Sequence, residues 1–194
     1  MGRIKGAAIR ARLEFLRAEH GDESVAKVLD TLDPMDQVVL SGTLLPSIWY
    51  PFHVLANLDE AIRRELGDGS NDVFEHAGDH VARQHARSIY KVFFRETDPE
   101  RVLKLASCIF ANYYSGLGRV SVRSTPQGAS RLQVADTPTA ARSHCVATMA
   151  YFRRVLEECC ARQIDARETR CKCWGDDCCE FEFAWQAEGL KATA

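Results

Sequence analysis

The sequence lacks a long apolar run, an excess of either charge, and any cysteine in its first 107 residues. Because nowhere do about 18 apolar residues follow one another, we expect no membrane-spanning helix. Residues 1–21 are charged throughout and contain no apolar core of a secretory signal, which favours a cytoplasmic location. A formal net charge of -2 offers no basic surface for nucleic acid. We therefore expect neither a membrane nor a nucleic-acid partner.

The composition is that of an ordinary globular protein. Of the 194 residues, 46% are hydrophobic and 27% are charged, so the chain is long enough to bury a core without disulfide bonds. No internal repeat or low-complexity linker divides it. We expect one domain over residues 1–194, made of a helical part (1–116), a zinc-binding β-β-α-β-β part (117–186) and a tail (187–194).

Apolar residues at helical spacing predict a helical layer at the N-terminus. Ile9 and Leu16 lie on the first helix, which we expect to end at Gly21, and a second short pattern precedes Pro34. Further helices are predicted over residues 51–66, 73–93 and 102–113, and residues 38–51 are predicted to form a loop or a short strand.

The apolar period changes to alternation after residue 117. Val120 and Val122 precede a turn at 125–128, and Leu132 and Val134 follow it, which predicts a hairpin. One more helix and two strands around the turn at 174–177 complete the chain. The predicted fold class is α+β, with an N-terminal helical layer followed by a β-β-α-β-β unit that contains a four-stranded antiparallel sheet.

Six of the eight cysteines fall in the last 36 residues: Cys159, Cys160, Cys171, Cys173, Cys178 and Cys179. In a cytosolic chain such a concentration indicates metal ligation or thiol chemistry rather than disulfides. Strand alternation places Cys179 on the core side of the last strand, together with Phe181, and Cys178 on the solvent side.

A spaced motif in this region resembles the 4-vinyl reductase domain family. It reads Glu168-x2-Cys171-x3-Gly175-x3-Cys179, and Cys145 precedes it. That family includes the sensory domains of phenol- and xylene-responsive transcription activators, and its fold is similar to that of TRAPP subunits. The resemblance implies a bacterial protein with one structural Zn²⁺ held by Cys145, Glu168, Cys171 and Cys179.

The strand period leaves the ligand set open. Glu168 and Cys171 have opposite parity on a regular strand, so both reach one ion only if the strand starts after Glu168 or contains a bulge. Cys173 or Cys178 could replace a named ligand, and buried thiols without a metal are the other interpretation. Four protein ligands leave no position for water, and no catalytic arrangement is visible, so we expect no enzymatic activity.

An apolar pocket between the helices and the sheet is the second candidate site. Its predicted lining comprises Trp49, Tyr50, Phe52, His53, Phe110, Tyr113 and Tyr114. The alternative is that these residues are ordinary core. His76 and His80, with His85 beyond them, could share a helix face, but no other metal ligands accompany them, so we interpret them as solvated or capped histidines.

The resemblance to the 4-vinyl reductase domain family implies a zinc-containing sensory or regulatory protein. We expect it to bind a small hydrophobic or aromatic molecule, to form a homodimer and to signal to a protein partner. One alternative is a scaffold or dimerisation module whose zinc is purely structural. Another is an accessory protein in tetrapyrrole reduction, although no nicotinamide or flavin fingerprint accompanies it.

Overall fold

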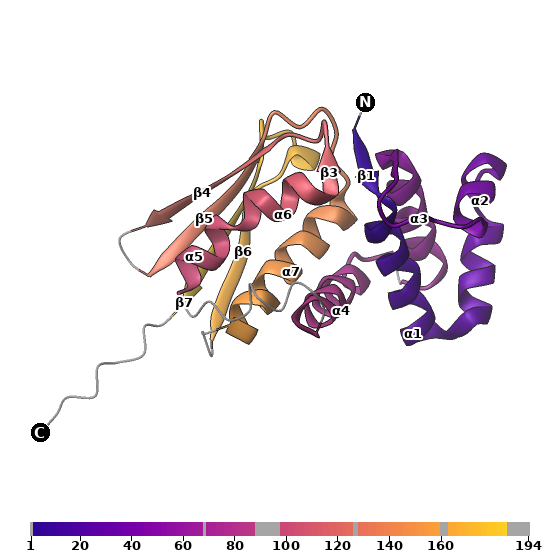
Figure 1. The fold of residues 1–194 in the computed structure, drawn as a ribbon, viewed down its shortest axis with the longest axis horizontal. Helices are drawn as coiled ribbons and strands as arrows, with labels where there is room; N and C mark the ends of the chain where they lie inside the picture. Colours follow the sequence, from indigo (N-terminus) through magenta and orange to yellow (C-terminus); the bar gives the residue numbers. More distant parts are fainter. Residues whose placement is uncertain (1, 68, 88–97, 126–127, 160–162, 186–194) are drawn as a thin grey trace, which may run out of the picture.

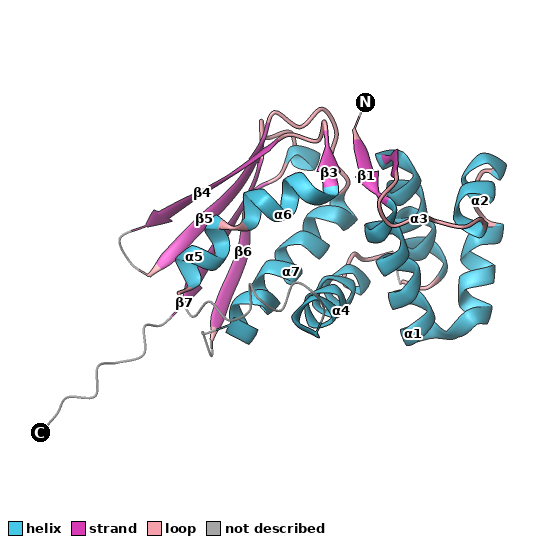
Figure 2. Cartoon of the chain, viewed as in Figure 1, coloured by secondary structure: helices cyan, strands magenta, loops and turns pink. Residues whose placement is uncertain are grey.

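A computed structural model describes residues 2–67, 69–87, 98–125, 128–159 and 163–185 (Figure 1). Helices gather at one end of the molecule and an antiparallel sheet forms the other (Figures 1 and 2). The predicted α+β fold class is confirmed. The predicted tail, residues 187–194, lies outside the described residues. Among the helices that are described, none is long and apolar enough to cross a bilayer.

The helical layer opens with a broken helix and a capped one. Helix α1 (Gly6–Asp30) is interrupted at Gly21, where φ is 80°, so the predicted helix end is a kink between two helical pieces. Helix α2 (Pro34–Ser41) begins where the Asp33 carboxylate accepts a hydrogen bond from a backbone N–H. The prediction of a loop or strand from residue 38 is wrong as far as Ser41, because this cap starts a helix before it.

Two longer helices and a small sheet complete this end of the molecule. The predicted helix over 51–66 is confirmed as α3 (Phe52–Glu65), and α4 (Val73–Arg87) follows the loop after it. Three short antiparallel strands pair in the order β2-β1-β3, and they are β1 (Arg3–Lys5), β2 (Trp49–Pro51) and β3 (Tyr114–Ser115). This small sheet joins the first residues of the chain to the segment before α3 and to residues 114–115.

The predicted helix over 102–113 is two helices, α5 (Pro99–Lys104) and α6 (Ala106–Tyr113), which meet at Leu105. The predicted hairpin is confirmed as β4 (Arg119–Thr125) and β5 (Ala129–Ala135). Helix α7 (Arg142–Cys159) then leads into β6 (Ile164–Arg170), a short 3-10 turn and β7 (Cys179–Trp185). The four long strands are antiparallel in the order β4-β5-β7-β6, and α7 lies across one face of them (Figure 1).

Two apolar clusters form the core. In the first, Leu58 and Ile62 of α3 pack with residues of α1 and α2. In the second, Leu156 of α7 packs against Phe181 and Phe183 of β7. Helix α7 belongs to both, because its Val146 is part of the helical cluster. This helix therefore joins the helical layer to the sheet.

The backbones of α4 and α7 approach closely at Gly78. A methyl group built on Gly78 would lie 2.3 Å from the carbonyl oxygen of Ala147 and 2.9 Å from the amide nitrogen of Tyr151. Both contacts are with backbone atoms, which cannot move aside as the end of a long side chain could. Only glycine fits here without a shift of one helix against the other.

We expect Gly78→Ala to lower the free energy of unfolding by about 1–3 kcal/mol, because overpacking outweighs the better helix propensity of alanine. Urea denaturation measures the effect. The control is Arg83→Ala on the exposed face of the same helix, which should stay within about 0.5 kcal/mol of wild type. A stabilised Gly78→Ala variant would contradict the close approach of the two helices.

Candidate functional site

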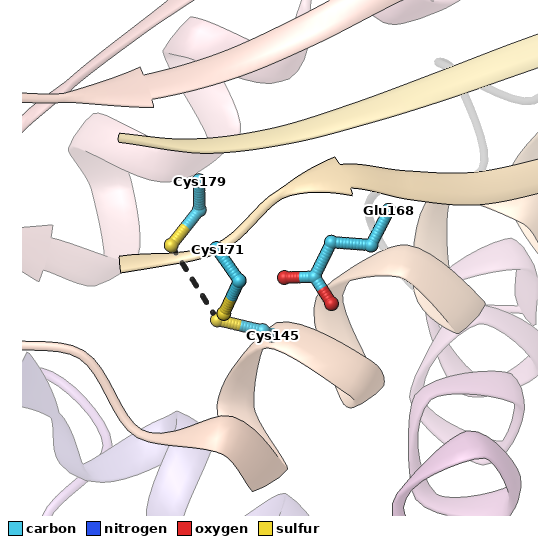
Figure 3. A group of neighbouring side chains, drawn as sticks. All are labelled: Cys145, Glu168, Cys171 and Cys179. Carbon is cyan, nitrogen blue, oxygen red and sulfur yellow. Dashed lines mark hydrogen bonds between the residues drawn. The ribbon is translucent and has the colours of Figure 1, made fainter. Parts of the chain in front are cut away.

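Three thiols and one carboxylate meet where α7 crosses the sheet (Figure 3). Cys145 lies in the first turn of α7, Glu168 on β6, Cys171 just after β6, and Cys179 at the start of β7. The ligand atoms of all four lie within 4.8 Å of one another, and the three thiols are buried. The structure therefore brings together the four side chains that the sequence motif grouped.

A bulge in β6 makes this grouping possible. Opposite β7, the pairing passes from Glu168 with Phe181 directly to Arg170 with Glu180, so one extra residue is inserted in β6. The insertion reverses the alternation of the strand, so that Glu168 and Cys171 reach the same side. The strand period allowed either a strand that starts after Glu168 or a bulge, and the structure contains the bulge.

The two alternative cysteine ligands lie outside the cluster. Cys173 is exposed on the 3-10 turn. Cys178 is buried, and its Sγ accepts a hydrogen bond from the side-chain amide of Gln133 at 3.2 Å. The prediction that Cys178 faces solvent is wrong, because β7 begins one residue later, at Cys179, and the alternation of the strand does not extend to Cys178.

The thiols interact closely with one another. The Sγ atoms of Cys145 and Cys179 are 3.6 Å apart. This hydrogen bond lowers the pKa of Cys179 to about 6, and the same bond together with burial raises the pKa of Cys145. The backbone N–H of Lys172, 3.5 Å from the Cys179 sulfur, also favours a thiolate there. Burial raises the pKa of Cys171 to about 12, so the cluster favours one thiolate, on Cys179.

Arg142 neutralises the carboxylate of the cluster. Its guanidinium forms an ion pair with Glu168, lies 3.9 Å from the Cys171 sulfur, and is covered by the ring of Trp174 at 4.6 Å from the centroid. The Glu168 side chain is 4% exposed, and its Oε1 has no hydrogen-bond partner among the described residues. That the four side chains hold a metal ion stays a prediction, since the pair with Arg142 also accounts for the buried charge.

We expect Arg142→Met to lower the free energy of unfolding by about 2–4 kcal/mol, because the buried Glu168 carboxylate loses its counter-charge. Arg119→Met is the matched control, since Arg119 pairs with Asp136 on the surface, and it should cost less than about 1 kcal/mol. Chemical denaturation at pH 7.5 compares the two variants. Equal losses would show that Glu168 does not depend on this pair.

A cavity of about 120 Å³ lies between the helical layer and the sheet. Small residues leave this space open: Ala7, Ala8 and Ala11 on α1, and Ala77 and Gly78 on α4. Most of the remaining wall is apolar and comes from α6, α7, β4 and β5. The residues that bring polar groups to the lining are Arg12, His85, Tyr113, Tyr114, His144, Thr148 and Tyr151.

Both histidines of the cavity are held neutral. Burial lowers the pKa of His85 to about 4, and its two ring nitrogens lie 3.0 Å and 3.3 Å from the hydroxyls of Tyr151 and Tyr113. Burial, followed by the positive charge of Arg12, lowers the pKa of His144 to about 4. Of the two interpretations that the sequence left for this histidine, solvated or capped, the first is wrong for His85.

Three of the seven predicted pocket residues line this cavity, namely Phe110, Tyr113 and Tyr114. Phe52 lines a smaller neighbouring cavity of about 40 Å³, which Phe110 also borders. The rings of Phe110 and Tyr114 pack together with their centroids 4.7 Å apart. Part of the predicted aromatic set therefore does face a shared internal space.

The other three predicted pocket residues line neither cavity. The ammonium of Lys5 lies over the ring of Trp49, the hydroxyl of Tyr50 accepts a backbone hydrogen bond at 3.1 Å, and the side chain of His53 is half exposed. Sequence reasoning missed Arg12 and His144. The signal for His144 was its place on α7, where it shares one helical face with other residues of the cavity wall.

The pKa of His144 gives the fold a pH dependence. The folded-state value of about 4 lies below the unfolded value of about 6.5, so the unfolded chain binds the proton more tightly. The resulting stability is complete above pH 6.5 and is lost as the pH falls towards 4. Between pH 7.5 and 4.5, wild type should lose about 2 kcal/mol more than His144→Gln. Thr148→Val, on the same wall, should behave as wild type in the same urea titrations.

Comparison with known proteins finds no matching family model and no matching curated protein. Solved structures do match. An H-NOX protein from S. oneidensis in the Fe(II)NO ligation state has a TM-score of 0.74 and 14% identity, and covers 95% of this chain and 100% of its own. The unliganded Fe(II) H-NOX protein from K. algicida gives 0.70 and 13%, with 95% and 97% covered. An oxygen-binding H-NOX domain related to soluble guanylate cyclases gives 0.70 and 9%, with 95% and 96% covered.

This chain has the H-NOX fold. The resemblance to the 4-vinyl reductase family and to TRAPP subunits is therefore wrong as an assignment, because the solved structures that match about 95% of this chain are H-NOX domains. The prediction of a structural Zn²⁺, which rested on that resemblance, is wrong as well. The matching H-NOX structures contain Fe(II) or heme, and a group of cysteines does not by itself identify zinc.

Proposed function

We propose that this domain is a sensory module that binds a small, largely apolar molecule in the cavity of about 120 Å³. The observation that carries the proposal is the cavity itself, which is walled by small and apolar side chains. An apolar cavity of about 150 Å³ in a protein can stay dry and bind benzene. The space is therefore suited to a molecule of about one aromatic ring or smaller.

The H-NOX fold supports a sensory role. Solved H-NOX structures include Fe(II)NO, unliganded Fe(II) and oxygen-bound forms, so domains of this fold do hold small ligands. We propose by analogy that occupancy of the cavity changes how the domain contacts a protein partner. A homodimeric state and a cytoplasmic location stay predictions.

The described cavity does not fit a haem. Haem iron takes an axial His, Cys, Met or Tyr ligand. Both nitrogens of His85 contact tyrosine hydroxyls, and burial raises the pKa of Tyr114. Among the histidines and tyrosines of the lining, His144 is therefore the side chain best placed to ligate an iron. The volume decides the question, since about 120 Å³ is well below the ~300 Å³ of the smallest pockets for drug-sized ligands.

The same volume bears on the two alternative functions. An accessory role in tetrapyrrole reduction would need a site for a macrocycle, and the cavity is too small for one. A scaffold without a ligand predicts that small aromatic molecules leave the stability of the domain unchanged, because only a molecule that binds the native state raises its melting temperature. Ligand-dependent melting therefore separates a scaffold from a sensor.

We expect toluene or phenol to raise the melting temperature of wild type, and Ala11→Leu to abolish this shift without loss of stability, because the larger side chain fills the cavity. Ala18→Leu, on the exposed face of the same helix, is the matched control and should keep the shift. Differential scanning calorimetry with and without each compound makes the measurement. If neither compound nor benzene shifts the melting of wild type, the sensory proposal fails and the scaffold is favoured.

A further inference from the structure

A buried ion pair lies beside the cavity. Arg12 of α1 is 7% exposed and Asp59 of α3 is 1% exposed. Their closest atoms, Nε and Oδ1, are 2.8 Å apart, but the geometry is not that of a hydrogen bond, and both atoms lack a hydrogen-bond partner among the described residues. The aligned contact is Nη2 to Oδ2 at 3.3 Å. The ring of Phe74 covers the guanidinium, with 5.0 Å from Cζ to the centroid.

Arg12 uses only part of its hydrogen-bonding capacity within the described chain. A guanidinium has five N–H donors, and the contact with Asp59 is the one hydrogen bond that joins Arg12 to the rest of the described chain. Arg12 also belongs to the cavity wall, next to Tyr114 and His144. A ligand oxygen in the cavity would therefore offer an acceptor to a guanidinium N–H that makes no hydrogen bond within the described chain.

The charges around Arg12 favour an uncharged ligand. Asp59 forms an ion pair with the guanidinium. Among the residues described, Arg12 is the one charged side chain of the cavity lining, since His85 and His144 are neutral. A carboxylate ligand would bring a second negative charge into an apolar space, where it would lose its hydration and be repelled by Asp59. A neutral carbonyl oxygen accepts a hydrogen bond without that cost.

We propose that the ligand of this cavity is an uncharged molecule of about one ring that carries an acceptor oxygen, such as an aryl ketone, and that Arg12 binds this oxygen. This inference rests on the proposed function, because it needs the cavity to bind a ligand. It adds the chemical class of the ligand and the residue that selects it.

The test compares three ligands of nearly equal shape by isothermal titration calorimetry. Acetophenone carries the acceptor, α-methylstyrene replaces the carbonyl oxygen by a methylene group, and benzoate carries a negative charge. We expect wild type to bind acetophenone at least about tenfold more tightly than either of the others. The double variant Arg12→Met/Asp59→Leu removes both charges, so that no unpaired charge remains buried. It should bind acetophenone and α-methylstyrene with about equal affinity.

The matched control is Arg153→Met, which removes an arginine that pairs with Glu75 and Asp79 away from the cavity lining, and it should keep the wild-type preference. Circular dichroism confirms that each variant is folded. Equal binding of acetophenone and α-methylstyrene by wild type would overturn the role of Arg12 and leave the cavity proposal intact. Tighter binding of benzoate would overturn the uncharged class. No binding of any of the three would overturn the inference together with the proposed function.

Discussion

The close packing of α7 against α4 is the contact on which the rest of this structure depends. Gly78 lets the two backbones approach, and the pair then holds the helical layer against the sheet. Because α7 contributes side chains to both apolar clusters, its position fixes how far apart the layers stand. The cavity is the space that remains where the layers meet over alanines instead of larger side chains.

The long periodic elements could be predicted from the sequence, because burial imposes a period of 3.6 or 2 on a helix or a strand that has one face in the core. The small sheet could not be predicted in full. Its strands have two or three residues each, which is too few to show any period. Similarly, the kink at Gly21 and the join at Leu105 change the path of a helix but leave its apolar pattern almost unaltered.

The candidate site shows what a local motif can and cannot predict. The motif from Cys145 to Cys179 grouped four side chains that do meet, and the bulge in β6 is one of the two arrangements that the strand period allowed. The family inferred from the same spacing was wrong, because a motif of this size constrains one corner of the sheet, whereas a fold is a property of the whole chain. Aromatic composition was a weaker guide to the cavity, since Trp49 and Tyr50 pack elsewhere and small residues create the space.

Two neighbouring residues of α7 belong to the two candidate sites, and both also line the smaller cavity of about 40 Å³. His144 borders the cavity and Cys145 belongs to the thiol cluster, as expected for consecutive positions that point about 100° apart around a helix. A turn of α7 about its own axis would therefore move the imidazole and the sulfur through the same angle. The cavity and the thiol cluster thus share one helix, and adjacent residues of that helix contribute to each of them.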